Sequence, residues 1–210
     1  MITLIKREIY DHIAYFLAAV ILAAAMIFVI CFSLFAIDPE DMPMFLFGLL
    51  TPGIVIFLFG CTGMGVSQMY LDRNWKISAF ITTLPATRSH IFIARMIAGI
   101  LAMSLFFIPL IIANIILYGF FVSPVPVYKE IVFDIFTVSF LITLSSYFIG
   151  LQTGWTTKRV IPSLAGLFLT CILITLVIIK GFNNYISFLL VLFIIASIIR
   201  VHQKFISASL

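Results

Sequence analysis

The sequence predicts an all-α integral membrane protein with six transmembrane helices, in which residues 1–210 form a single transmembrane domain. Of these residues, 64% are hydrophobic and 10% are charged, whereas soluble proteins average roughly 45–50% apolar and about 25% charged residues. The mean hydropathy is +1.29. So little charge cannot cover a water-facing surface, and a bilayer is therefore expected to replace water around most of the chain.

A helix that crosses a bilayer needs about 20 predominantly apolar residues. We identify six such runs, at approximately residues 13–37, 44–70, 89–121, 131–154, 160–179 and 185–199. The runs do not alternate apolar and polar residues as the strands of a membrane β-barrel do. Because backbone groups in lipid must be hydrogen-bonded within the protein, each run is predicted to be a helix.

The basic residues predict which side of the membrane each helix end faces. Six spans place both termini on one side, together with residues 71–90 and 155–159. Ten of the twelve lysines and arginines fall on that side: Lys6, Arg7, Arg73, Lys76, Arg88, Arg95, Lys158, Arg159, Arg200 and Lys204. Cytoplasmic loops are enriched in basic residues. The sequence therefore predicts a multi-pass protein of the cell (inner, cytoplasmic) membrane with cytoplasmic N- and C-termini.

The centres of the six runs contain no Asp, Glu, Lys, Arg or His residue. Ionisable side chains inside a bilayer mark proton relays and ion pathways, so we predict no ion-coupling site, catalytic residue, metal site or cofactor. His12, His90 and His202 lie at cytoplasmic ends and are interpreted as interfacial anchors. Asn114 is strongly polar and lies deep in a span, where a hydrogen bond between helices is favoured over contact with a substrate.

Glycines in the second and fourth runs predict close contacts between helices. Gly60, Gly63 and Gly65 are spaced like a glycine-rich phosphate loop, but they lie in a predicted span and no lysine follows them. Gly150 and Gly154 have the spacing of small residues at membrane helix interfaces. We therefore expect these glycines to allow close helix approach or a bend, and we do not expect phosphate binding.

The segment between the second and third runs, residues 72–88, predicts a short amphipathic helix on the cytoplasmic side. Its defining residues are Asp72, Arg73, Trp75, Lys76, Phe80, Leu84, Pro85 and Arg88. An approximately helical apolar stripe is formed by Trp75, Phe80, Ile81 and Leu84, with Ile77 alongside. The aspartate or the nearby Asn74 can cap the start, and the proline ends the helix. Such a helix could lie on lipid headgroups or fill a groove on a cytosolic partner.

With these features the chain resembles the membrane subunit of ATP-binding-cassette (ABC) transporters, specifically the type-2, exporter-like permeases. Four segments carry the resemblance: residues 4–12 with Lys6, Arg7 and Glu8, similar to an interfacial elbow helix; the polar exit 68–73; Leu84-Pro85-Ala86-Thr87-Arg88; and the return into a long span at 91–95. Two features depart from the family. Asp72 and Asn74 stand where a Glu and a Gly are usual, and residues 180–184 leave little room for re-entrant helices.

The resemblance implies a permease subunit that forms a translocation path for export, as a homodimer or heterodimer in membrane lipid. A separate cytoplasmic ABC ATPase would move the short helix as a lever, with Trp75, Phe80 and Leu84 as buried anchors and with Arg73 and the other basic residues orienting the docking. The sequence contains no GxxxxGK[ST] motif, so ATP hydrolysis is expected in the partner and this chain is not predicted to be an enzyme. We predict no nucleic-acid partner.

Three alternatives stay open at this point. The short helix could lie on the membrane surface without a partner. The protein could be a non-catalytic scaffold or assembly subunit of a larger membrane complex, since its spans carry little visible chemistry. A membrane enzyme would need a polar cluster at the cytoplasmic face, for which Gln68, Asp72, His90 and Gln152 are the candidates.

Overall fold

The computed structural model describes residues 2–36, 42–74, 88–121, 126–156, 160–181 and 184–207, with side chains for residues 2–32, 51–70, 89–116, 133–154, 164–181 and 184–205. The described residues form seven helices and no strand: α1 (Ile2–Asp11), α2 (Ile13–Ala36), α3 (Met42–Asn74), α5 (Arg88–Phe121), α6 (Pro126–Thr156), α7 (Val160–Lys180) and α8 (Asn184–Ser207). The prediction of an all-α protein is confirmed. Most of the short helix predicted over residues 72–88 falls on residues 75–87, outside the described residues, while residues 72–74 belong to α3 and Arg88 to α5.

Five helices contain a described segment that is long and apolar enough to cross a membrane: Ile13–Phe32 of α2, Thr51–Tyr70 of α3, Ser89–Ile116 of α5, Phe133–Gly154 of α6 and Asn184–Phe205 of α8. The described apolar segment of α7, Leu164–Lys180, is shorter. Several helices of membrane length agree with the predicted multi-pass membrane protein. The sixth span stays a prediction.

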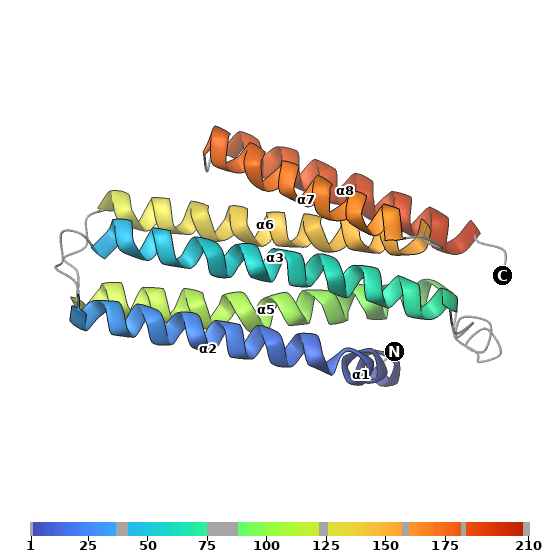
Figure 1. Ribbon diagram of the computed structural model, residues 1–210, viewed down its shortest axis with the longest axis horizontal. Coiled ribbons are helices and arrows are strands. Elements are labelled where there is room, and N and C mark those ends of the chain that lie inside the picture. The colour runs from blue at the N-terminus through green and yellow to red at the C-terminus, as the bar shows by residue number, and fades with distance from the viewer. Residues whose placement is uncertain are drawn as a thin grey trace.

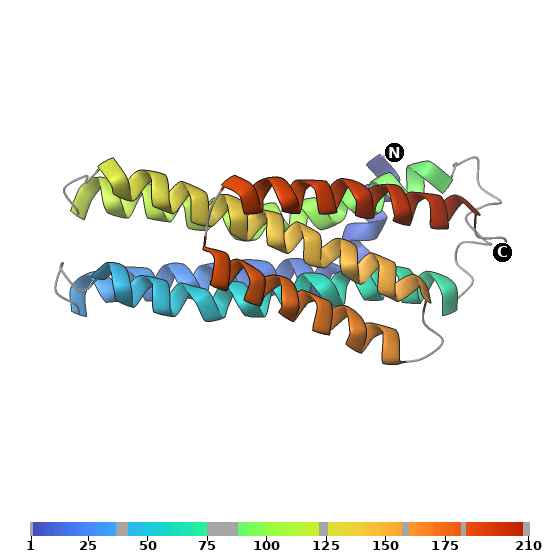
Figure 2. The ribbon, with the colours of Figure 1, turned by 90° about the horizontal axis from the view of Figure 1, so that it is seen from above.

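The long helices run along one common axis, and α1 lies across that axis at one end of the bundle (Figures 1 and 2). Helices α3 and α6 pack against each other in the middle of the bundle, α2 packs on α5 and α3, and α7 and α8 both pack on α6. The end of α3, the start of α5 and the end of α8 lie at the same end as α1 (Figure 1). The two helix ends that flank residues 75–87 therefore lie at the α1 end of the bundle.

Helices α1 and α2 are separate because the chain turns at His12. The His12 backbone N–H donates to Glu8 O at 3.2 Å, and the Tyr15 N–H donates to His12 O at 3.0 Å. Hydrogen bonding thus continues through the turn while the helix direction changes. The resulting α1 is amphipathic: it buries Glu8, whereas Ile2 and Tyr10 are 82% and 62% exposed.

Helix α2 shows how the apolar spans divide between the core and the outer surface. Its buried residues recur every three or four positions: Phe16, Ala19, Ala23, Met26 and Ile30. This spacing is one face of a helix, and large apolar side chains elsewhere on α2, such as Ile21 and Phe28, are exposed. Helix α6 is the most enclosed of the candidate spans, with 67% of its apolar segment buried against 28% in α2. The core of the bundle is therefore built around α6.

Glycines set the distance between α3 and α6. A Cβ atom built on Gly65 would lie 2.5 Å from Tyr147 O, one on Gly154 would lie 2.6 Å from Val66 O, and one on Gly150 would overlap Thr62 O. The two backbones thus approach more closely than any side chain allows, which confirms the predicted role of these three glycines. Gly60 has no such neighbour, since a Cβ atom there would meet nothing within 4 Å.

Candidate functional site

A cluster of buried polar side chains lies at the α1 end of the bundle. Its members, which we call the Arg95 cluster, are Glu8 and His12 from the α1–α2 corner, Gln68 from α3, Arg95 from α5 and Tyr147 from α6. All five side chains are buried, and Arg95 is only 1% exposed. Enclosed ionisable groups in a membrane protein are costly and are kept for a function or for a defined structure, so this cluster is the candidate site.

The centre of the cluster is an ion pair between α1 and α5. Arg95 Nε donates to Glu8 Oε1 at 3.4 Å, and the other carboxylate oxygen of Glu8 lies 3.8 Å from His12 Nε2. Arg95 Nη1 also contacts Met69 Sδ of α3 at 3.6 Å, and the guanidinium carbon lies 5.5 Å from the ring centre of Phe205 of α8. The Arg95 side chain therefore contacts three helices other than its own.

Tyr147 connects α6 to the same cluster. Its hydroxyl lies 2.7 Å from Gln68 Oε1 and 3.0 Å from Arg95 O, and donates to these two acceptors. Because a phenol has a single proton, the two acceptors share it. The ring packs directly on Gly99 of α5, where a Cβ atom would overlap it. Tyr147 thus fixes the spacing of α3, α5 and α6 at this level of the bundle.

One polar group of the cluster has no hydrogen-bond partner among the described residues. Gln68 Nε2 is buried without a hydrogen-bond partner among the described residues, while the amide oxygen of the same side chain accepts from Tyr147. An unsatisfied buried donor has a free-energy cost of about 1–3 kcal/mol. The position of Gln68 is therefore determined by the neighbouring helices rather than by the best pairing of its own amide.

The hydroxyl of Tyr147 gives a first testable prediction. Substituting Tyr147→Phe removes the donor from two buried acceptors and is expected to lower the unfolding free energy by about 1–3 kcal/mol. SDS-induced unfolding in bicelles measures this loss. Tyr10→Phe is the matched control, since Tyr10 is exposed and its ring, 5.9 Å from Lys6 Nζ, is retained. Equal losses in the two variants would contradict the assigned role of the Tyr147 hydroxyl.

The residues predicted for the elbow helix lie in α1 but face different ways. Lys6 is exposed, and Arg7 Nε is 3.3 Å from Asp11 Oδ2 in a pair whose side chains are 36% and 52% exposed. Glu8 is buried and pairs with Arg95. The interpretation of His12 as an interfacial anchor is wrong, because that side chain is buried beside Glu8; His90 is exposed.

The remaining histidine joins two helices near the cluster. His202 Nε2 of α8 lies within hydrogen-bond distance of Ser89 Oγ of α5, at 3.0 Å. Its ring centre is 5.6 Å from that of Phe92, which is also in α5. His202 therefore packs against the first turns of α5 and helps to hold α8 at this end of the bundle.

The predicted coupling residues fall largely outside the described part of the chain. Asp72 and Arg73 lie in the last turn of α3, and Arg88 is the first residue of α5. Their side chains are not among those described. Residues 75–87, with the other predicted coupling residues Trp75, Lys76, Phe80, Leu84 and Pro85, lie between the described ranges. The coupling helix therefore stays a prediction.

Asn114 is buried in α5, as expected for a polar side chain in a membrane span. Its Nδ2 donates to Leu110 O at 3.4 Å, one turn earlier in the same helix. This bond lies within α5, and the predicted hydrogen bond between helices stays a prediction. Asn114 lies well away along the helix from Arg95 and is not a member of the cluster.

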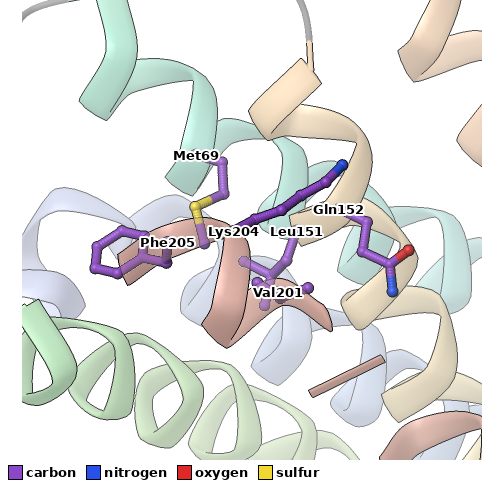
Figure 3. Close-up of a pocket in the computed structure, with 6 residues that line it drawn as sticks. All are labelled: Met69, Leu151, Gln152, Val201, Lys204 and Phe205. Atoms are coloured by element: carbon purple, nitrogen blue, oxygen red, sulfur yellow. The ribbon is translucent and has the colours of Figure 1, made fainter. Parts of the chain in front are cut away.

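Three of the four polar residues considered for a membrane enzyme have described side chains, and the surroundings of these three differ. Gln68 is buried against Tyr147, and His90 is exposed. Gln152 lines a depression whose other lining residues are Met69, Leu151, Val201, Lys204 and Phe205 (Figure 3). The depression has no room for a water molecule between its walls. It is therefore part of the packing around the Arg95 cluster, with Met69 and Phe205 separating it from the arginine.

The Arg95 cluster joins α1, α3, α5 and α6 at one end of the bundle by an ion pair and a shared tyrosine hydrogen bond. The guanidinium of Arg95 also packs on the Phe205 ring of α8. Comparison of the chain with protein-family models, curated proteins and solved structures finds no match. The functional proposal therefore depends on the sequence motifs and on this geometry.

Proposed function

We propose that this chain is the permease subunit of an ABC transporter, working with a separate cytoplasmic ATPase in export. The observation that carries the proposal is the position of α1. This amphipathic helix lies across the bundle at the end where α3 stops and α5 starts (Figures 1 and 2). The segment that resembles a coupling helix stands between α3 and α5 in the sequence, and α1 lies at the end of the bundle where the two flanking helix ends lie.

The length of α7 supports six spans. Its 21 residues extend over about 31 Å at about 1.5 Å per residue, and the hydrocarbon core of a bilayer is about 30 Å thick. Six spans place both termini on the same side, which is the cytoplasmic side by the distribution of basic residues. Lys6 and the apolar residues Ile2 and Tyr10 on the exposed face of α1 then meet the headgroup layer, where basic and aromatic side chains are favoured.

In the proposed mechanism the ATPase binds the segment between α3 and α5. Trp75, Phe80 and Leu84 enter a groove on the partner, as the anchors of an amphipathic helix do, and the basic residues Arg73, Lys76 and Arg88 orient it. Closure of two ATPases on ATP then moves the first turns of α5 in a dimer of permease chains. The energy for transport comes from the partner.

The docking segment gives the second prediction. Combined substitution of Trp75, Phe80 and Leu84 by Ala is expected to abolish co-purification of an ATPase from native membranes, because buried aromatic and apolar anchors dominate such interfaces. Mass spectrometry of the purified complex measures the partner. Phe168→Ala is the control, since this aromatic residue belongs to α7, outside residues 75–87, and is 69% exposed. Full retention of the ATPase by the triple variant would refute docking at this segment.

A non-catalytic scaffold of a larger complex is the second candidate function. It is favoured by the centres of the six apolar runs, which contain no Asp, Glu, Lys, Arg or His residue. A scaffold purified from native membranes would bring down other membrane subunits and no ATPase. The purification that tests docking therefore separates the two functions.

A further inference from the structure

We propose that Arg95 is a positioning residue that makes α1 move together with the start of α5. Displacement of the α3–α5 connection is thereby transmitted to α1 through the Glu8–Arg95 ion pair. This inference rests on the proposed function, because it names the route by which movement at the docking segment reaches the rest of the bundle. It assigns to Glu8 a role inside the bundle rather than at the membrane surface.

The positions of the residues along the two helices support this route. Arg95 follows the first residue of α5, Arg88, by about two helical turns, which is roughly 10 Å along the helix. Met69 precedes the last residue of α3, Asn74, by less than two turns. Each helix that flanks the connection therefore carries, within about two turns of the connection, one side of the Arg95–Met69 contact.

The contacts of Arg95 distribute a movement of α5 over four other helices. Its guanidinium binds Glu8 of α1, contacts Met69 of α3 and packs on Phe205 of α8. Its carbonyl oxygen accepts from Tyr147 of α6. A shift of the first turns of α5 therefore pulls on each of these helices through one residue.

The Glu8–Arg95 ion pair makes α1 move together with α5. An amphipathic helix held only by headgroups can slide in the plane of the membrane, but α1 directs Glu8 toward the bundle and exposes Ile2 and Tyr10. Opposite charges interact far more strongly in a protein interior than in water. Separating Glu8 from Arg95 would leave both charges in a buried environment, so movement of α1 with α5 has the lower free energy.

The test uses the complete complex with its co-purified ATPase in native membrane vesicles. A reporter cysteine replaces Thr3, which is exposed on α1, after Cys31, Cys61 and Cys171 are replaced by Ala. The rate of maleimide labelling is measured with and without Mg-ATP and vanadate. We expect a severalfold change in the rate in the parent complex, and no change in Glu8→Gln although the ATPase stays bound.

Two further variants separate coupling from folding. The double variant Glu8→Gln/Arg95→Met removes both charges together, is expected to fold, and is expected to lack the response. Asp11→Asn breaks the exposed Arg7–Asp11 pair on the same helix. This variant is expected to keep the change in labelling rate. A normal response in the double variant, or no response in the parent complex with ATPase bound, overturns the inference. Absence of any bound ATPase in the parent preparation overturns the proposed function itself.

Discussion

Glu8→Gln is expected to destabilise the bundle by about 3–5 kcal/mol, the range found when one partner of a buried ion pair is removed. The reason is the enclosure of Arg95, which keeps its charge at all accessible pH values and is only 1% exposed. Without the Glu8 carboxylate the guanidinium loses the anion that it contacts at 3.4 Å. Water cannot replace that contact unless α1 leaves α5. SDS-induced unfolding in bicelles measures the loss.

A double-mutant cycle identifies the origin of this loss. Removing both charges in Glu8→Gln/Arg95→Met is expected to restore most of the stability, because an apolar or neutral pair of similar volume is often as stable as a buried ion pair. Arg7→Gln and Asp11→Asn serve as controls on α1, and each is expected to cost at most about 1 kcal/mol, as for exposed pairs. If the effects of Glu8→Gln and Arg95→Met simply add, the two residues do not act as a pair.

The helices were predictable from the sequence because the apolar runs are long and are separated by charged or proline-containing segments. The burial of Arg95 was not predicted. Counting basic residues assigns each of them to a side of the membrane, but it does not show which face of the helix each one occupies. In α5 almost every neighbour of Arg95 is apolar, so hydrophobic periodicity cannot show that Phe92, Arg95 and Ala98 form the inward face.

A signal for Glu8 was present in α1. Ile5 precedes Glu8 by three residues and Ile9 by four, and His12 follows Glu8 by four residues and Ile9 by three. These four residues lie on one face, and each is at least partly buried. A carboxylate in the middle of an apolar helical stripe indicates a buried partner. The identity of that partner depends on α5 crossing α1, which is a tertiary contact that the local sequence does not encode.

The glycines were predicted only in part for a related reason. The spacing of Gly150 and Gly154 is typical of helix interfaces, and both contact α3 closely. The spacing alone does not separate Gly65, which faces α6, from Gly60, which faces open space. Five residues along a helix correspond to about 500° of rotation, so the two positions point in clearly different directions.

This difference provides a matched pair of substitutions for the α3–α6 contact. Gly150→Ala places a Cβ atom against Thr62 O, and since a backbone atom cannot rotate away, the helices must separate. Overpacking of this kind costs about 1–3 kcal/mol, and Gly150→Ile is expected to cost more. Gly60→Ala, where a Cβ atom meets nothing within 4 Å, is expected to be neutral or slightly stabilising, since Ala is the better helix former.

Separation of α3 from α6 would also weaken a hydrogen bond in the Arg95 cluster. The Tyr147 hydroxyl of α6 donates to Gln68 of α3 across 2.7 Å, and Gly65 packs on the backbone of Tyr147 itself. A shift of a few tenths of an ångström at Gly150, one turn from Tyr147, therefore weakens this bond. We expect Tyr147→Phe to cost less stability in the Gly150→Ile background than in the parent chain, as coupled sites do. Strict additivity in the unfolding titrations would show that the glycine contact and the polar cluster are independent.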